Sequence, residues 1–321
     1  MSTYKLAAEF VQEGMMRDAY CQTMINLAKE DERVVMLDAD LMSSMGTAPF
    51  LKEFPERTFN VGVQEANMIG MAAGMNATGL IPYAHTFGPF ASRRCFDQLF
   101  LSIAYTKASV RVIGSDPGIT AAFNGGTHMP FEDYGIIRNI PEATILEPVD
   151  ATMLSDLLTQ SKERPGLTYI RLLRKNAIKI YEDGSTFEIG KGATLIEGSD
   201  VTIIATGIMV KEALDAAEML KAEGISAKVV NMFTIKPIDK ELVIACAKET
   251  GALVTAENHS IINGLGSAVS EVLTDNKPVP LERVGVKDLF GEVGPVDYLR
   301  ERFELRAEDI VAGAKKAIAR K

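Results

Sequence analysis

A single carboxyl group stands at the head of a segment that has little side-chain bulk. Glu65 follows the apolar run of residues 59–63 and begins a stretch made almost wholly of alanine, glycine and methionine. Its small residues recur at helical spacing, at Ala66, Gly70, Ala73, Gly74 and Ala77. Such a face lets another backbone approach closely, either that of the chain's own sheet or that of a second subunit. An acid in the first turn of a helix is often only a cap, but a nearly buried acid where subunits meet is a candidate for proton chemistry.

Two further stretches place aromatic and titratable side chains beside glycine-rich turns. Phe87 and Phe90 flank a Gly-Pro pair and precede an Arg-Arg pair. Because Gly and Pro break a local helix, both rings are expected near a loop-to-helix junction, although core packing is the commoner role of aromatics at this spacing. His128 lies in a glycine-rich loop that follows the buried run 108–116. Loops just beyond parallel strands bind ligands in α/β proteins, so His128 is more than a surface histidine in this interpretation.

The elements that must position these side chains alternate between strand and helix patterns. Strand-like runs cover residues 33–40, 108–116, 143–150 and 167–174, with helical patterns at 15–31 and 150–164. A polar, glycine-rich connector with room for a short strand or hairpin fills residues 175–198. The alternation then restarts with strands at 201–210, 226–233 and 252–258 and helices at 211–224 and 240–251, the first of which ends in a glycine suited to a left-handed C-cap. This pattern predicts an α/β protein with two doubly wound domains, 1–190 and 191–321, the first on a mainly parallel sheet.

Composition excludes several classes of function. The 321 residues carry a net charge of -9 without a basic stretch, which argues against a nucleic-acid partner. The longest apolar run, 201–210, is too short to span a bilayer, and no signal-peptide core begins the chain. Three scattered cysteines and three histidines predict reduced thiols, no metal site of the chain's own and a cytoplasmic location. Neither half contains a dinucleotide or nucleotide phosphate loop, which argues against a dehydrogenase or an NTPase.

At the three candidate stretches the sequence resembles the thiamine-diphosphate enzymes of the transketolase family. The family's Gly-x-x-Glu reads here as "GVQE", its Thr-Phe before the pyrimidine pocket as "HTFGPF", and its "GPTH" loop as "GGTH". In the second half, "VVNMFTIKPID", "AENHSIINGLGSAVSE" and "RVGVKDLFG" are similar to the family's C-terminal domain. The resemblance runs in order over nearly the whole chain. It implies a pyrimidine-binding domain at 1–190 and a smaller transketolase C-terminal α/β domain at 191–321.

One part of the family pattern has no counterpart in this sequence. The family binds the cofactor's diphosphate through a divalent metal held by a Gly-Asp-Gly motif and a following Asn, and no such segment occurs here. The resemblance therefore implies one subunit of a split transketolase. A separate N-terminal subunit would hold the diphosphate with a Mg or Ca ion, and thiamine diphosphate would be shared between the two chains. Two copies of each chain, an α2β2 heterotetramer, is the assembly that the family suggests.

The resemblance also assigns roles on the cofactor side of the site. Glu65 is expected to hydrogen-bond nitrogen N1′ of the pyrimidine and so to promote loss of the proton from the thiazolium carbon C2. Phe87 and Phe90 would form the aromatic slot for the pyrimidine. Arg93 stands where some relatives have an aromatic wall of that slot. Asp40 matches an acid that approaches the cofactor.

On the substrate side the match to the family is less complete. Arg17, Ser44 and Arg174 fall on positions that hold sugar phosphates in relatives, and guanidinium groups suit such anions. His128 matches the catalytic histidine that contacts the transferred ketol. Asn124 replaces an acid that contacts a substrate hydroxyl, and Ser115 replaces a histidine that contacts phosphate. These departures leave open whether the substrate is a sugar phosphate, a sulfonate or a branched sugar.

The resulting hypothesis is a transferase subunit that moves a two-carbon ketol unit from a ketose to an aldose in carbohydrate metabolism. The alternatives are a deoxyxylulose-phosphate synthase-like subunit, a 2-oxoacid dehydrogenase β-like subunit, or a non-catalytic partner that kept the fold. Retention of Glu65 argues against the last, because a scaffold does not need that acid. His259, in "AENHSIINGLGSA", and the turn near Gly291 are interpreted as structural.

Overall fold

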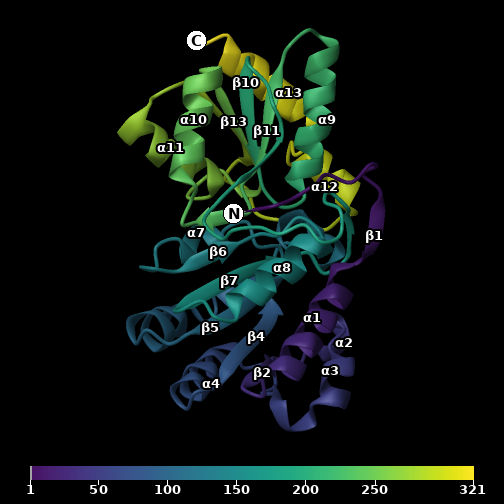
Figure 1. Cartoon of the computed structure of the whole chain (residues 1–321), viewed down its shortest axis with the longest axis vertical. Helices are drawn as coiled ribbons and strands as arrows, with labels where there is room; N and C mark the ends of the chain where they lie inside the picture. The colour runs from purple at the N-terminus through teal and green to yellow at the C-terminus, as the bar shows by residue number, and fades with distance from the viewer. Residues whose placement is uncertain (1) are drawn as a thin grey trace.

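Two twisted sheets, each covered by helices on both faces, follow one another along the chain (Figure 1). The structure is a computed structural model, and it describes residues 2–321. The purple-to-teal half of the chain forms the larger unit and the green-to-yellow half the smaller one (Figure 1). The predicted fold class, two doubly wound α/β units with the larger one first, is confirmed.

The larger sheet has seven strands in the order β12-β6-β7-β5-β4-β2-β3, all parallel except β12. Its strands are β2 Val34–Asp38, β3 Thr58–Asn60, β4 Ile81–Phe87, β5 Val110–Ser115, β6 Thr144–Leu146, β7 Leu167–Leu172 and β12 Thr234–Lys236. Strands β2, β5 and β7 are buried over their whole length, as expected for a parallel sheet covered on both faces. Strand β12 comes from beyond residue 190, so the proposed division at that residue assigns one strand of the larger sheet to the second domain.

Helices cover the two faces of the larger sheet according to the alternation of its side chains. Val34 and Met36 of β2 pack with α1 (Met16–Glu30) and α8 (Ala151–Ser161), whereas Val35 and Leu37 face the opposite layer. That layer contains α4 (Glu65–Ala77) and the π-helical segment η2 (Leu99–Tyr105). Shorter elements complete this unit: α2 Met42–Met45, α3 Ala48–Glu53, η1 Pro55–Arg57, α5 Gly88–Ser92, α6 Phe96–Gln98, η3 Gly118–Asn124 and α7 Asp133–Ile137.

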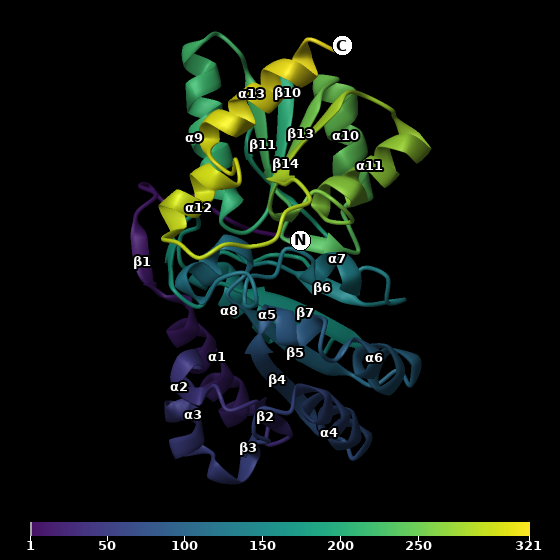
Figure 2. The same ribbon diagram turned by 180° about the vertical axis from the view of Figure 1, so that it is seen from behind.

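The smaller sheet has the order β14-β13-β10-β11-β9, with β9 antiparallel to the rest. Its strands are β9 Ala193–Ile196, β10 Val201–Ala205, β11 Ala227–Asn231, β13 Leu253–Ser260 and β14 Leu281–Val286. As Figure 2 shows, α9 (Met209–Ala222) and α13 (Ala307–Ile318) lie on one side of it, with α10 (Lys240–Thr250) and α11 (Leu265–Asn276) on the other. Helix α12 (Val296–Arg302) extends toward the larger unit.

The structure corrects several predicted boundaries for local reasons. The apolar run 201–210 is a strand only to Ala205, because Gly207 turns the backbone with φ +54° and α9 begins at Met209. The run 143–150 is a strand only to Leu146. Gly224 has the predicted left-handed conformation after α9, with φ +80°. The connector contains β8 (Asn176–Ile178), paired with β1 (Gln12–Met15). Within residues 2–321, no helix is long and apolar enough to cross a membrane.

Asp150 fixes the start of α8 from a fully buried position. Its carboxylate accepts hydrogen bonds from the backbone N–H groups of Met153, Ile180 and Tyr181 at 2.8–2.9 Å. Burial raises the pKa of Asp150 to about 6, although these hydrogen bonds act in the opposite direction.

Stability is expected to depend on pH through Asp150. Between about pH 4 and pH 6 the folded chain retains a proton on Asp150 that the unfolded chain has released, so its contribution to the free energy of unfolding falls as pH rises, by about 3 kcal/mol in all. Denaturant titrations of the wild type and Asp150→Asn from pH 4 to pH 7 should show the wild type losing stability relative to the variant. A constant difference across this range would contradict the assignment.

Candidate functional site

Several of the sequence-predicted residues lie at the carboxyl edge of the larger sheet or just beyond it. In register, Phe87 at the end of β4 lies beside Ser115 at the end of β5, which in turn lies beside Leu172 of β7. The segments that leave these strands carry Phe90, Asp116 and Arg174. This edge is where ligands bind in parallel α/β sheets.

An aromatic cluster forms where β4 passes directly into α5. The ring centroids of Phe87 and Phe90 are 6.3 Å apart, and the His128 ring lies 5.6 Å from Phe87 and 5.1 Å from Phe90. The Nδ1 atom of His128 is hydrogen-bonded to the hydroxyl of Thr127 at 2.8 Å. The predicted loop-to-helix junction is therefore a strand-to-helix junction, because Gly88 and Pro89 occupy the first turn of α5.

Glu65 is the first residue of α4 and is 2% exposed. Both of its carboxylate oxygens lie 2.9 Å from Nη1 of Arg94, and the Arg94 guanidinium carbon lies 3.9 Å from the centre of the Phe90 ring. Arg94 was not predicted to be a site residue. Arg93, which was, instead pairs with Glu132 at 2.9 Å. A hollow of about 300 Å³ beside Arg93 is also lined by Gly126, Met129 and Glu132.

A second group of polar residues gathers next to Phe87. Nη1 of Arg17 and Nη1 of Arg174 donate to the same carbonyl, that of Ser44, at 2.8 and 3.2 Å. Arg174 also pairs with Asp116 at 2.9 Å and lies 5.4 Å from the Phe87 ring centre. Burial raises the pKa of Asp116, and Arg174 opposes this shift. Asp116 was missed from the sequence, although an acid directly after a buried strand is a recognisable signal.

Three predicted residues lie at the margins of this arrangement. Asp40 is exposed beyond the end of β2 and exchanges two hydrogen bonds with Asn60. Asn124 is exposed at the end of η3. Ser115 is fully buried, with its hydroxyl 3.4 Å from Asp116. Among residues 2–321, no group of three His, Cys, Asp or Glu side chains is arranged to hold a metal ion.

A series of buried, hydrogen-bonded side chains near the carboxyl edge of the sheet was not predicted from the sequence. Nε2 of His85 contacts Asp38, and Nδ1 of His85 is 3.2 Å from the hydroxyl of Tyr20. All three side chains are fully buried. Asp38 also accepts from the backbone N–H of Leu41 at 2.6 Å, which fixes the path of the chain where it leaves β2.

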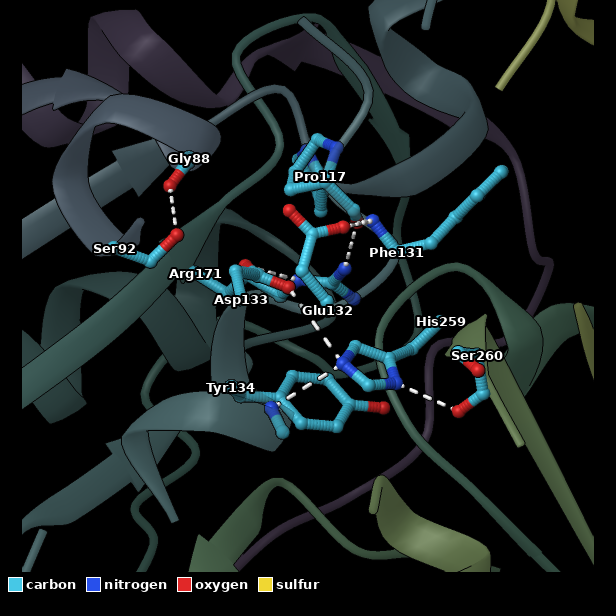
Figure 3. A network of polar contacts seen from close by, with 12 residues as sticks. Gly88, Ser92, Pro117, Phe131, Glu132, Asp133, Tyr134, Arg171, His259 and Ser260 are labelled. Carbon is cyan, nitrogen blue, oxygen red and sulfur yellow. Dashed lines mark hydrogen bonds and ion pairs between the residues drawn. The ribbon is translucent and has the colours of Figure 1, made fainter. Parts of the chain in front are cut away.

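A second buried network joins β7 to the segment that follows His128, and Figure 3 shows two of its members, Arg171 and Asp133. Arg171 of β7 is fully buried and pairs with Asp133 and Glu147, each at 2.9 Å. It also donates to the carbonyl of Pro130 at 2.9 Å. Asp133 accepts a further hydrogen bond from Tyr169 at 2.8 Å. These bonds hold the segment 130–133 against strand β7 of the larger sheet.

Two family models together match most of the chain. The transketolase pyrimidine binding domain matches residues 12–179, and the transketolase C-terminal domain matches residues 190–310. The chain belongs to the transketolase family.

Similar proteins cover this transketolase-family chain almost completely. It is 52% identical to the 6-deoxy-6-sulfo-D-fructose transketolase subunit SqwH of Clostridium sp. (strain MSTE9), over 97% of each chain. It is 46% identical to a putative transketolase C-terminal section of Methanocaldococcus jannaschii, over 92% of this chain and 93% of that one. Among solved structures, a split gene transketolase described as an inactive beta4 tetramer superposes with a TM-score of 0.89. That protein is 43% identical, with 96% of this chain and 100% of the other covered.

Proposed function

We propose that this chain is a subunit of a split transketolase that transfers a two-carbon ketol unit from a ketose to an aldose with thiamine diphosphate. The observation that carries the proposal is the shared contact of Glu65 and Phe90 with one planar group. Both bind the Arg94 guanidinium, Glu65 through two oxygens and Phe90 through its face. An aminopyrimidine that carries a proton at N1′ is also a flat group with N–H donors at its edge, so the residues present fit the cofactor's ring.

The chain's own residues have distinct tasks in the proposed reaction. Thiamine diphosphate, when bound, supplies the carbon that attacks the ketose carbonyl. Glu65, nearly buried at the positive end of α4, holds or shares a proton at nitrogen N1′ of the pyrimidine. Phe87 and Phe90 stack with that ring and exclude water from it. His128, held by Thr127, hydrogen-bonds the oxygen of the ketol fragment.

The diphosphate and its metal are proposed to be held by a separate chain, in an α2β2 assembly. The small-residue face of α4 supports a subunit contact, because Gly70 and Gly74 have no atom within 4 Å of the place a Cβ would take. Both glycines are exposed in the single chain. The description of the related structure as an inactive beta4 tetramer also supports the need for a further subunit.

The donor is proposed to be a ketose that carries a sulfonate, as the name of the 52% identical relative suggests. Arg17, Arg174 and Lys175 supply three positive charges, and Asp18 and Asp116 two negative charges, which leaves one net positive charge in this group. A sulfonate carries a single negative charge, whereas a phosphate ester carries close to two at neutral pH. Relatives have a histidine where this chain has the buried Ser115. A serine cannot carry a positive charge, which is consistent with a substrate anion of lower charge than a phosphate.

Ketol transfer by the reconstituted pair of chains tests the function. Donors to compare are 6-deoxy-6-sulfo-D-fructose, xylulose 5-phosphate and pyruvate, with ribose 5-phosphate as one acceptor. Transfer from either ketose supports a transketolase. The ratio of kcat/KM for the two ketoses shows whether the site prefers a sulfonate or a phosphate. Activity with pyruvate alone would replace the proposal with a deoxyxylulose-phosphate synthase-like or 2-oxoacid dehydrogenase β-like reaction.

Loss of the guanidinium in Arg174→Gln is expected to raise KM for the sulfonated donor about 10- to 100-fold with a smaller effect on kcat. Hydrogen bonds to a charged group contribute about 1.5–3 kcal/mol, which corresponds to this range. Steady-state kinetics with D-fructose, which lacks the anion, provide the control and should change little. An equal rise in KM for both donors would show that Arg174 acts through the fold rather than on the anion.

A further inference from the structure

Both ends of the loop that carries His128 are held by one short segment of the other domain. We name residues 117–135 the site loop and residues 257–260, at the end of β13, the clamp. Asn258 binds the start of the site loop: its Nδ2 donates to the carbonyl of Pro117 at 2.9 Å, and its Oδ1 accepts from the N–H of Ile119 at 3.0 Å. Asn258 is fully buried, so both hydrogen bonds are shielded from water.

The neighbouring clamp residues bind the far end of the same loop (Figure 3). The backbone N–H of Ser260 donates to the carbonyl of Phe131 at 2.8 Å. Nε2 of His259 accepts from the N–H of Gly135 at 3.2 Å, while its Nδ1–H donates to its neighbour's carbonyl, that of Ser260, at 2.7 Å. The His259 ring also stacks on Tyr134, with centroids 4.0 Å apart and planes 9° from parallel.

Glycines on the site loop make room for the clamp at each end. A Cβ on Gly118 would lie 2.1 Å from Oδ1 of Asn258, and Gly118 has a φ of +48°. A Cβ on Gly135 would lie 2.8 Å from Cε1 of His259. The site loop and the clamp are therefore shaped to each other at both contacts, which general packing between domains does not require.

The loop between these two anchors carries the side chains that reach the site. His128 contacts Phe87 and Phe90, and Glu132 pairs with Arg93 at 2.9 Å. Ala122 has a φ of +49°, a strained backbone conformation for a residue with a side chain, and such a conformation persists only where the surrounding structure holds it. The rings of the cofactor slot, in contrast, lie on β4 and α5, outside the loop.

We propose that Asn258 and His259 are positioning residues for substrate: they fix both ends of the site loop and thereby set the place of His128 over the aromatic cluster. The inference rests on the proposed function for its kinetic consequence, but its structural part stands on the contacts alone. The C-terminal domain, which sequence reasoning treated as structural, then takes part in the reaction through these two side chains.

Hydrogen exchange and kinetics of Asn258→Ala and His259→Ala, in the complex with the diphosphate-binding chain, test this proposal. Amides of residues 117–135 should exchange at least 10-fold faster, while those of β5 and β7 are unchanged. The value of kcat/KM for ketol transfer should fall at least 10-fold, without a change in the affinity for thiamine diphosphate. Lys236→Met is the matched control, because Lys236, at the end of β12, also donates to backbone carbonyls, those of Arg138 and Ile140, but outside the site loop.

A second pair of variants separates positioning from general packing. Gly135→Ala alone should loosen the site loop by pushing His259 away. The same change made in His259→Ala should add less, because the two closest contacts, with the His259 ring, are then gone and only the Asn263 carbonyl oxygen, at 3.3 Å, is left to shift. Exchange that rises evenly over both sheets, or an unchanged site loop, would overturn the proposal. If the wild type transfers no ketol, the proposed function fails, and hydrogen exchange still decides whether the clamp holds the loop.

Discussion

The Glu65→Gln variant is expected to lower kcat of the reconstituted enzyme by about 10²- to 10⁴-fold, the range for loss of a positioned proton-transfer group. Glutamine keeps the shape of the side chain and can still accept a hydrogen bond, but it cannot exchange a proton with the pyrimidine. Because Glu65 is 2% exposed and begins α4, the substitution alters chemistry with little repacking. Single-turnover rates with the ketose donor measure the effect directly.

Glu241→Gln is the matched control for this variant. Glu241 also lies in the first turn of a helix, α10, but it is exposed and pairs with Lys191 at 3.1 Å. Its loss should leave kcat unchanged. If Glu65→Gln also retains full activity, Glu65 is a helix cap, and the non-catalytic partner becomes the better interpretation of the chain.

Removing the charge of Arg171 is expected to cause the largest loss of stability. Arg171→Met leaves Asp133 and Glu147 buried without their cation, and breaking a buried ion pair in this way costs about 3–5 kcal/mol. The carbonyl of Pro130 loses its donor as well. Urea denaturation followed by circular dichroism should show the shift in midpoint, and a variant that no longer accumulates in folded form would agree with it.

Two comparison variants keep this prediction open to refutation. Lys107→Met breaks an exposed pair with Glu142 and should leave the midpoint nearly unchanged. The triple change Arg171→Met, Asp133→Asn and Glu147→Gln removes the uncompensated charges and should recover part of the loss. A midpoint for Arg171→Met equal to that of Lys107→Met would show that the buried network does not contribute to stability.

The regular elements of this fold were predictable because their patterns are local. Buried runs in β2, β5 and β7 and amphipathic patterns in α1 and α8 are visible in the sequence without any tertiary information. Strand β12 was not predictable in the same way. Its three residues join the larger sheet only because the chain returns to β6 after crossing into the smaller unit.

The contacts within the site could not be predicted, because the spacing of residues in the sequence does not determine where each side chain points. Arg93 and Arg94 are adjacent, and the geometry of one short turn decides which of them lies on Phe90 and which pairs with Glu132. The clamp was missed for a related reason. Asn258 lies 139 positions from its partner Ile119, and nothing in the local sequence of either residue indicates the other.

Because β12 pairs with β6 but follows it late in the sequence, the larger sheet is completed late in synthesis. Until residues 234–236 arrive, β6 has an open hydrogen-bonding edge, and these residues follow Leu146 by almost ninety positions. At ribosomal speeds of about 5–20 residues per second, that interval lasts roughly 5–20 s. We expect nascent chains that stall within this interval to expose the unpaired edge of β6 to their neighbours on the polysome, so slower translation through this region should lower the yield of soluble protein.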